Sequence, residues 1–187
     1  MKATQILMEE HRVVERVISP LVIAVQRLER GEELRPTFFI NAALFIKNFA
    51  DGCHHHKEED ILFVAMNAAG MPSDSGPLAV MLAEHAQGRA FTAAMKAAAE
   101  SWEKGDPRTK PVVAHNAQGY VNLLRYHIQK EDKILFPMAE KAIPAQQQDQ
   151  VDAGFEEAGE KESTTGVQEK FRALADVLEK ESVRKLH

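Results

Sequence analysis

The sequence predicts an all-α protein, an up-down-up-down four-helix bundle followed by a C-terminal helical extension. Three observations predict this fold. Apolar residues recur every three or four positions through four long stretches of the chain. No stretch shows the apolar–polar alternation of a half-buried strand. Short segments with glycine and proline separate the stretches, and short connections favour antiparallel neighbouring helices.

The first two helices can be placed from their apolar stripes. The first is expected to end near Gly31, and the second to run from about Pro36 to Ala69. The inward stripe of the first helix comprises Leu7, His11, Val14, Ile18, Leu21, Val25 and Leu28. The inward stripe of the second comprises Phe39, Ala43, Ile46, Ala50, His54, Glu58 and Ile61.

The third and fourth helices follow a loop from Ala69 to Pro77. The third helix should stop around Lys104, and the fourth should run from about Lys110 to Ala142. The inward stripe of the third comprises Met81, His85, Gly88, Thr92, Met95, Ala99 and Trp102. The inward stripe of the fourth comprises Val113, Asn116, Tyr120, Leu123, His127, Glu131 and Ile134.

Beyond Pro144 the sequence becomes rich in glutamine and acidic residues, and a last amphipathic segment carries Phe171, Leu174 and Leu178. We therefore expect two parts: a helical bundle over residues 1–142 and an accessory helical extension over residues 143–187.

Composition excludes several classes of function. The formal net charge is −5 and no basic stripe is present, so we expect no nucleic-acid partner and no anionic membrane partner. Charged residues come too early in the N-terminal segment for a secretion signal, and the longest apolar run is too short to span a bilayer. The single cysteine, Cys53, excludes an internal disulfide, and we expect it to be a small buried apolar residue. These features predict a cytoplasmic protein.

Polar residues interrupt every apolar stripe, and their spacing is duplicated. The segments HHHKEEDILF and HIQKEDKILFP align without a gap, which matches the pair His54 and Glu58 with the pair His127 and Glu131. A histidine and a glutamate four positions apart share one face of a helix. His11 lies 43 positions before His54, and His85 lies 42 positions before His127. Since unpaired polar groups are costly to bury, the six side chains are predicted to share bound metal.

The other two histidines of the HHH run are predicted to lie outside this site. His55 shares a helix face with Asn48, Asp51 and Glu59, which indicates that it points outward. His56 falls on the far side of the helix from His54. Replacing either one is therefore expected to change little.

These motifs resemble the hemerythrin-like proteins, also called HHE cation-binding domains. The resemblance covers roughly residues 1–142 and is carried by EEHRVVE, HHHKEEDILF, AEHAQGR and HIQKEDKILFP. It implies a four-helix bundle that holds two non-haem iron ions, joined by carboxylates and an oxo or hydroxo bridge. Carried over by position, it implies His11 and His54 on one iron, His85 and His127 on the other, and Glu58 and Glu131 as bridges.

One position departs from the oxygen-carrying members of that family. Their third helix carries a second histidine one turn after the first, and Arg89 stands at that position here. The sequence thus resembles a variant with four histidines and two glutamates, in which both metals would keep open positions. Arg89 would then need a partner, such as Glu15, Glu84 or a bound anion.

Three further residues are candidates for contacts around the metal ligands. Tyr120 lies two turns before His127 on the same face, either as a hydrogen-bonding phenol or as a core tyrosine. Glu15 lies one turn after His11, either as an exposed residue or as a ligand or its neighbour. Glu84, beside His85, is expected to lie near the ligands or at the surface.

Two classes of function remain. The first is a di-iron protein that binds or senses a small ligand such as oxygen or nitric oxide, or that senses iron. The second is an enzyme that acts on peroxide or another reactive oxygen or nitrogen species. We favour the first class because no separate acid, base or nucleophile accompanies the metal ligands.

Overall fold

The fold is entirely helical over residues 1–184, the part of the chain that this computed structural model describes. The last three residues of the expected extension, 185–187, lie outside the described part. No strand occurs within residues 1–184, which confirms the all-α prediction. No helix within these residues combines the length and apolar character needed to cross a bilayer.

The first half of the chain forms two long helical rods. The first rod is α1 (Lys2–Glu29). The second begins with α2 (Pro36–Phe45), where Pro36 occupies a first-turn position that needs no backbone N–H donor. It continues through the π-helical segments η1 (Ile46–His55) and η2 (Glu58–Leu62) into α3 (Phe63–Ala68).

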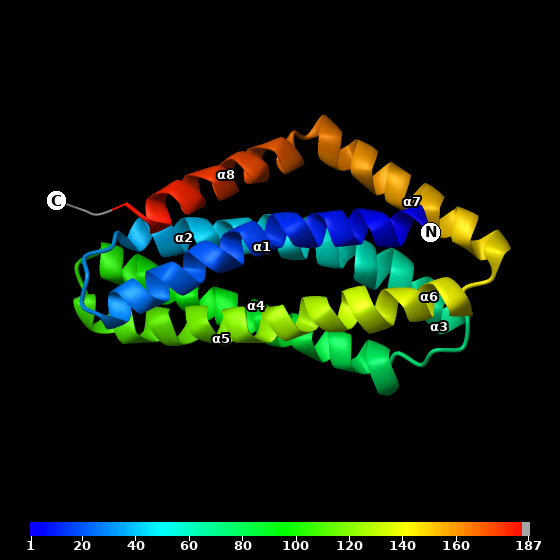
Figure 1. Cartoon of the computed structure of the whole chain (residues 1–187), viewed down its shortest axis with the longest axis horizontal. Helices are drawn as coiled ribbons and strands as arrows, with labels where there is room; N and C mark the ends of the chain where they lie inside the picture. The colour runs from blue at the N-terminus through cyan, green and yellow to red at the C-terminus, as the bar shows by residue number, and fades with distance from the viewer. Residues whose placement is uncertain (185–187) are drawn as a thin grey trace.

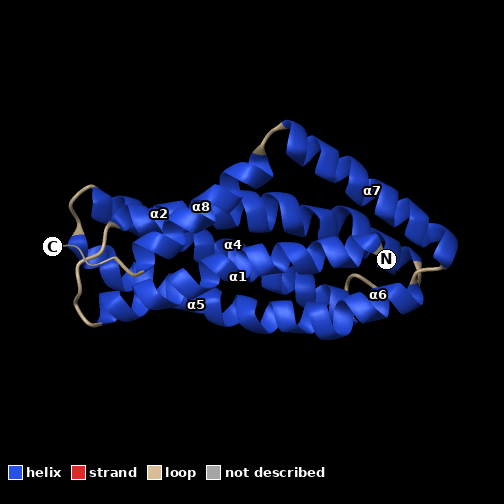
Figure 2. Cartoon of the chain, turned by 45° about the horizontal axis from the view of Figure 1, so that its top comes forward, coloured by secondary structure: helices blue, strands red, loops and turns tan. Residues whose placement is uncertain are grey.

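The second half repeats this arrangement. Helix α4 (Gly76–Glu103) is followed by the short 3₁₀ turn η3 (Pro107–Thr109) and by α5 (Lys110–Lys130). A π-helical segment, η4 (Glu131–Leu135), then leads into α6 (Phe136–Ala142). The four rods lie side by side along the long axis (Figures 1 and 2), with α4 packed along both α2 and α5, and α1 packed along α5.

The remaining chain forms α7 (Ala145–Thr164) and α8 (Val167–Ser182). Figure 1 shows the two helices meeting at an angle above α1, near Gly166, whose φ of +65° suits a residue without a side chain. Helix α8 packs along α1 and α2 and buries Phe171 and Leu178 in the same apolar cluster as the bundle. Helix α7 buries Val151 and Phe155 in a second cluster.

The two apolar clusters leave a polar layer between them. On α1, Ala3 and Leu7 belong to one cluster and Val13 to Val25 contribute to the other. His11 lies between them. Each of the other three rods also contributes to both clusters, with Glu58, His85 or Glu131 between its two contributions. The candidate metal ligands therefore occupy the middle of the molecule, with apolar packing on both sides.

Two predicted inward positions are wrong, and both lie in π-helical turns. Ile134 was expected to face inward but is 55% exposed, whereas the next residue, Leu135, is buried. The equivalent shift makes Leu62 fully buried, while Ile61 is only partly buried. A π turn closes over five residues instead of four, so the inward face moves along by one position.

Candidate metal centre

Two groups of buried side chains could each hold a cation. One consists of His11, His54, Glu58 and Glu131, and the other of His55, His85, His127 and Glu58. Within each group the donor atoms all lie within 4.8 Å of one another, which is near the spread of about 4 Å expected for donors at about 2 Å from one ion. The structure thus brings together all six side chains that the repeat singled out, and adds His55.

The two glutamates lie between the histidine groups. Glu131 places Oε2 3.1 Å from His11 Nε2 and Oε1 3.1 Å from His127 Nε2. Glu58 places Oε1 3.4 Å from His54 Nε2 and Oε2 3.4 Å from His85 Nε2. Each carboxylate therefore offers one oxygen to each side, which is the arrangement needed to bridge two cations.

Several of these buried atoms lie near one another without forming a hydrogen bond within the described chain. They are both carboxylate oxygens of Glu58 and of Glu131, together with the Nε2 atoms of His11 and His54. Unpartnered buried polar atoms are rare because each is costly, and a bound cation would satisfy all of them. The donor set therefore fits a two-metal site.

Each of the four predicted histidines is held from behind by a carboxylate at its Nδ1 atom. The distances are 2.7 Å from His11 to Asp132, 3.2 Å from His54 to Glu10, 2.7 Å from His85 to Glu59 and 2.9 Å from His127 to Glu84. A carboxylate that accepts the Nδ1 proton leaves the Nε2 lone pair free, directed at the metal position.

These outer carboxylates follow the sequence repeat. Glu10 and Glu84 each precede a lone histidine and contact the histidine of the HxxxE motif in the same half of the chain. Glu59 and Asp132 each follow a bridging glutamate and contact the lone histidine of the other half. The two halves therefore hold each other's histidines in place.

A cation accompanies each outer carboxylate. Lys57 pairs with Glu10, Lys130 with Glu84, Arg89 with Glu59, and Arg12 with Asp132. Four positive charges thus offset the four outer carboxylates. The negative charge of the two bridging glutamates is left for the histidines or a bound metal to compensate.

The phenylalanines of the two ILF segments cover the histidines. Phe136 stacks on His11 with ring centroids 5.6 Å apart, and Phe63 stacks on His85 at 6.0 Å. These aromatic rings keep water away from the donor groups and strengthen the local electrostatics.

The pKa values of the histidines reflect their carboxylate partners. Burial alone would lower the pKa of His54, but Glu58 and Glu10 outweigh it and raise the pKa to about 10. Burial opposes the same effect at His127, where Glu131 and Glu84 raise the pKa to about 9. Metal binding must therefore displace protons from these imidazoles.

The predicted orientation of His55 is wrong. It was expected to point outward, but it is only 6% exposed and stacks on His85 with ring centroids 3.8 Å apart. Burial lowers its pKa to about 4, which leaves the imidazole neutral. His55 ends the π-helical segment η1, whose wider turns allow the neighbouring His54 and His55 both to face the interior. His56 is exposed and pairs with Asp60, as expected for the far side.

Comparison with known proteins agrees with this geometry. The family model described as the hemerythrin HHE cation binding domain matches residues 2–139. The chain belongs to this hemerythrin family. The match contains every residue of the two donor groups.

Curated relatives of this hemerythrin-family chain are described as uncharacterized proteins. Proteins of Mycobacterium tuberculosis (Rv1995) and Mycobacterium bovis (Mb2018) are each 24% identical over 143 residues, covering 76% of this chain and 55% of the relative. The chain thus spans about half the length of the curated relatives it matches. No solved structure gives a significant match.

The three remaining candidate residues differ in whether they contact a residue of the hemerythrin donor groups. Glu84 contacts His127, as described above. Glu15 is half exposed, pairs with Arg12 and is in neither donor group, which agrees with the expectation of an exposed residue. Tyr120 is buried and lines the same cavity as His55, and its hydroxyl has no partner within residues 1–184.

Arg89 has partners other than those expected. Its guanidinium donates to Asp51 and Glu59, both at 2.6 Å, and pairs with neither Glu15 nor Glu84. The ring that stacks on His85 comes from His55 of the neighbouring rod. The four-histidine interpretation therefore overlooked one buried histidine in the cluster.

The prediction for Cys53 is confirmed, and three outer carboxylates were not predicted from the sequence. Cys53 is buried, as expected, and is absent from both donor groups. Sequence reasoning missed Glu10, Glu59 and Asp132. Their signal was present in the repeat, because an acid precedes each lone histidine and another follows each bridging glutamate.

Proposed function

We propose that this chain is a non-haem di-iron protein whose iron pair binds or senses a small ligand such as oxygen or nitric oxide. In this proposal residues 1–142 form the up-down-up-down bundle and residues 143–187 an accessory extension. The observation that carries it is the position of the two buried carboxylates, each offering one oxygen to each histidine group.

The proposed ligand set follows from the donor groups. His11 and His54 would hold one iron, while His85, His127 and His55 would hold the other. Glu58 and Glu131 would bridge the two, with an oxo or hydroxo bridge completing the pair. Mixed imidazole and carboxylate donors suit iron better than a soft metal ion, and iron supplies reversible redox chemistry and affinity for diatomic ligands.

The uneven number of histidines predicts where an external ligand binds. One side offers three imidazoles and the other two, because the repeat places Ile128 where the first half has His55. The position held by His11 and His54 thus has the smaller protein donor set, and it is the one that we expect to accept the external ligand.

The alternative is an enzyme that acts on peroxide or another reactive oxygen or nitrogen species. The same donor groups would serve it, but the four outer carboxylates behind the histidines are already engaged with imidazoles and cations, so none of these four is free to act as an acid or base. Binding or sensing is therefore the function the geometry supports best.

A metal analysis combined with absorption spectroscopy tests the proposal. The purified protein should contain about two irons per chain, and the reduced form should change its visible spectrum on adding oxygen or nitric oxide. One metal per chain, or zinc alone, would contradict the di-iron proposal. Rapid, catalytic loss of peroxide, with no persistent spectral change from oxygen or nitric oxide, would favour the enzyme.

A further inference from the structure

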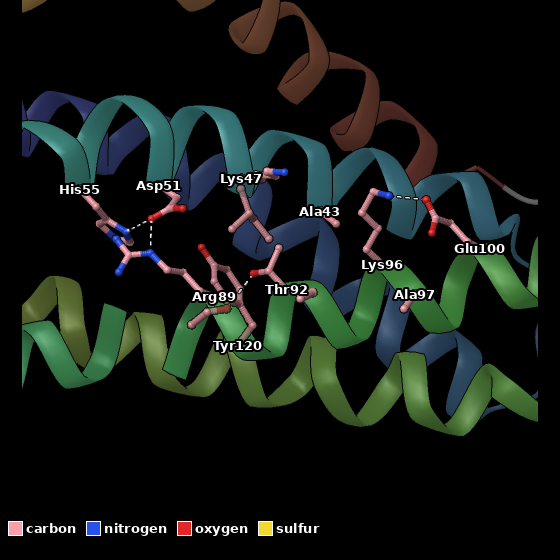
Figure 3. Close-up of a pocket in the computed structure, with 13 residues that line it drawn as sticks. Ala43, Lys47, Asp51, His55, Arg89, Thr92, Lys96, Ala97, Glu100 and Tyr120 are labelled. Carbon is pink, nitrogen blue, oxygen red and sulfur yellow. Dashed lines mark hydrogen bonds and ion pairs between the residues drawn. The ribbon is translucent and has the colours of Figure 1, made fainter. Parts of the chain in front are cut away.

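A cavity of about 420 Å³ opens between the α2–η1 rod and α4, beside the candidate metal centre (Figure 3). Its lining on α4 runs from Gly88 to Glu100, or about 18 Å at the rise of an α-helix. This volume falls in the range of pockets for small organic molecules, roughly 300–1,000 Å³, and is far larger than a diatomic ligand needs. The cavity is therefore long and large enough for an organic molecule.

The hydroxyl of Tyr120 is a buried polar group of this cavity that has no hydrogen-bond partner in the described part of the chain. Tyr120 is 2% exposed, lines the cavity, and its hydroxyl finds no hydrogen-bond partner within residues 1–184. The neighbouring hydroxyl of Thr92, by contrast, donates to the carbonyl of Gly88. Burial raises the pKa of Tyr120, so the phenol stays protonated and can donate to an oxygen of a bound molecule.

The walls around this hydroxyl are mainly apolar. Ala43 and Ile46 line the cavity from the α2–η1 rod, and Ala93 and Ala97 line it from α4. Figure 3 shows Ala43 and Ala97 on opposite sides of the space. Small alanine side chains leave this space open, and burial of an apolar chain between them would be favourable.

One exposed lysine at the cavity stands outside the ion pairs of its charged residues. Arg89 pairs with Asp51, and Lys96 pairs with Glu100. Lys47 also lines the cavity, and no ion pair within residues 1–184 engages it. An anionic end group would therefore be favoured over a cationic one at this site.

We propose that this cavity binds a medium-chain fatty acid. The apolar chain lies along α4 between the alanines, and a carboxylate oxygen accepts a hydrogen bond from Tyr120 in the field of Lys47. This site goes beyond the proposed metal function and does not depend on metal being bound. In this arrangement the carboxylate end of the fatty acid lies at the end of the cavity that His55 lines.

Calorimetric titration of the full chain with decanoate tests the proposal. Decanoate should bind saturably at one site per chain, and acetate, which lacks the apolar chain, should not. Ala93→Leu, which fills the cavity at an exposed position, should weaken decanoate binding about tenfold or more. Tyr120→Phe should weaken it about fivefold through loss of one hydrogen bond.

A matched control and a metal control separate the alternatives. Ala90→Leu adds the same bulk to α4 at an exposed position outside the cavity and should leave the affinity unchanged. The affinity should also survive chelation of the metal. The proposal is overturned if decanoate fails to saturate, or if Ala93→Leu and Ala90→Leu bind it equally. Binding that disappears on chelation but persists in Ala93→Leu would mean that the carboxylate binds the metal instead.

Discussion

Lys57 and Glu162 form an ion pair, with 2.8 Å between Nζ and Oε1, that joins helix α7 to the back of the candidate metal centre. Lys57 also donates to Glu10 at 2.6 Å, and Glu10 contacts His54. The counterpart of Lys57 in the repeat is Lys130, whose side chain is 35% exposed, whereas Lys57 is 1% exposed. Helix α7 therefore makes the two halves of the site different, because it covers the lysine of one half and leaves the equivalent lysine of the other half partly exposed.

We predict that Glu162→Gln lowers the free energy of unfolding by about 1–3 kcal/mol. The change leaves a buried ammonium with one carboxylate in place of two, and the cost of that burial is no longer offset. Urea denaturation followed by circular dichroism measures the effect. Glu160→Gln, at an exposed position on the same helix, removes the same charge and should have almost no effect. Equal stability of the two variants would show that Glu162 does not stabilise the buried lysine.

His55→Ala is expected to remove much of the metal bound at the position held by His85 and His127. The imidazole is buried against His85 and belongs to that donor group. Iron content per chain should fall from about two toward about one, because one position loses a donor. His56→Ala changes an exposed side chain in the same run of three and should retain the full content. The sequence alone predicted that neither change would matter, so a full metal content in His55→Ala would restore that interpretation.

Glu59→Gln and Asp132→Asn should each weaken metal binding about 10- to 100-fold while the ligands themselves remain. Each change removes the charge that orients a histidine from the other half of the chain, His85 for Glu59 and His11 for Asp132. Competition with a chelator of known affinity gives the metal dissociation constants. Asp60→Asn, on the exposed pair with His56, is the matched control. Unchanged affinity in both variants would mean that the outer carboxylates do not tune the site.

Chelation should destabilise the protein, because the bridging carboxylates would be left buried without partners. If metal is supplied at about 1,000 times its dissociation constant, binding contributes about 4 kcal/mol. For a chain of this size that corresponds to a fall of about 8–16 °C in melting temperature on chelation. Calorimetry with and without chelator measures it.

Glu58→Ala supplies the internal control for that measurement. Without the bridge the variant should lose metal, so its melting temperature should respond little to the chelator. A wild-type melting temperature that does not change after complete removal of metal would contradict the coupling of metal binding to stability.

The sequence by itself determined the helical class and singled out the six candidate donors. The stripe of apolar residues on each helix and the duplicated HxxxE spacing depend only on helical periodicity, which acts between residues near one another in the chain. The four rods and the convergence of His11, His54, His85 and His127 follow from that local pattern.

Only the tertiary structure decided which further residues face the site. His55 and Ile134 were misplaced because π-helical turns shift the inward face by one position, a change that the 3.6-residue period does not reveal. The partners of the outer carboxylates come from the opposite half of the chain, and Glu162 reaches Lys57 across 105 positions. Such contacts depend on how whole helices pack, because the energy of burying a charge is set by the neighbours that the fold supplies and not by the residue's place in the sequence.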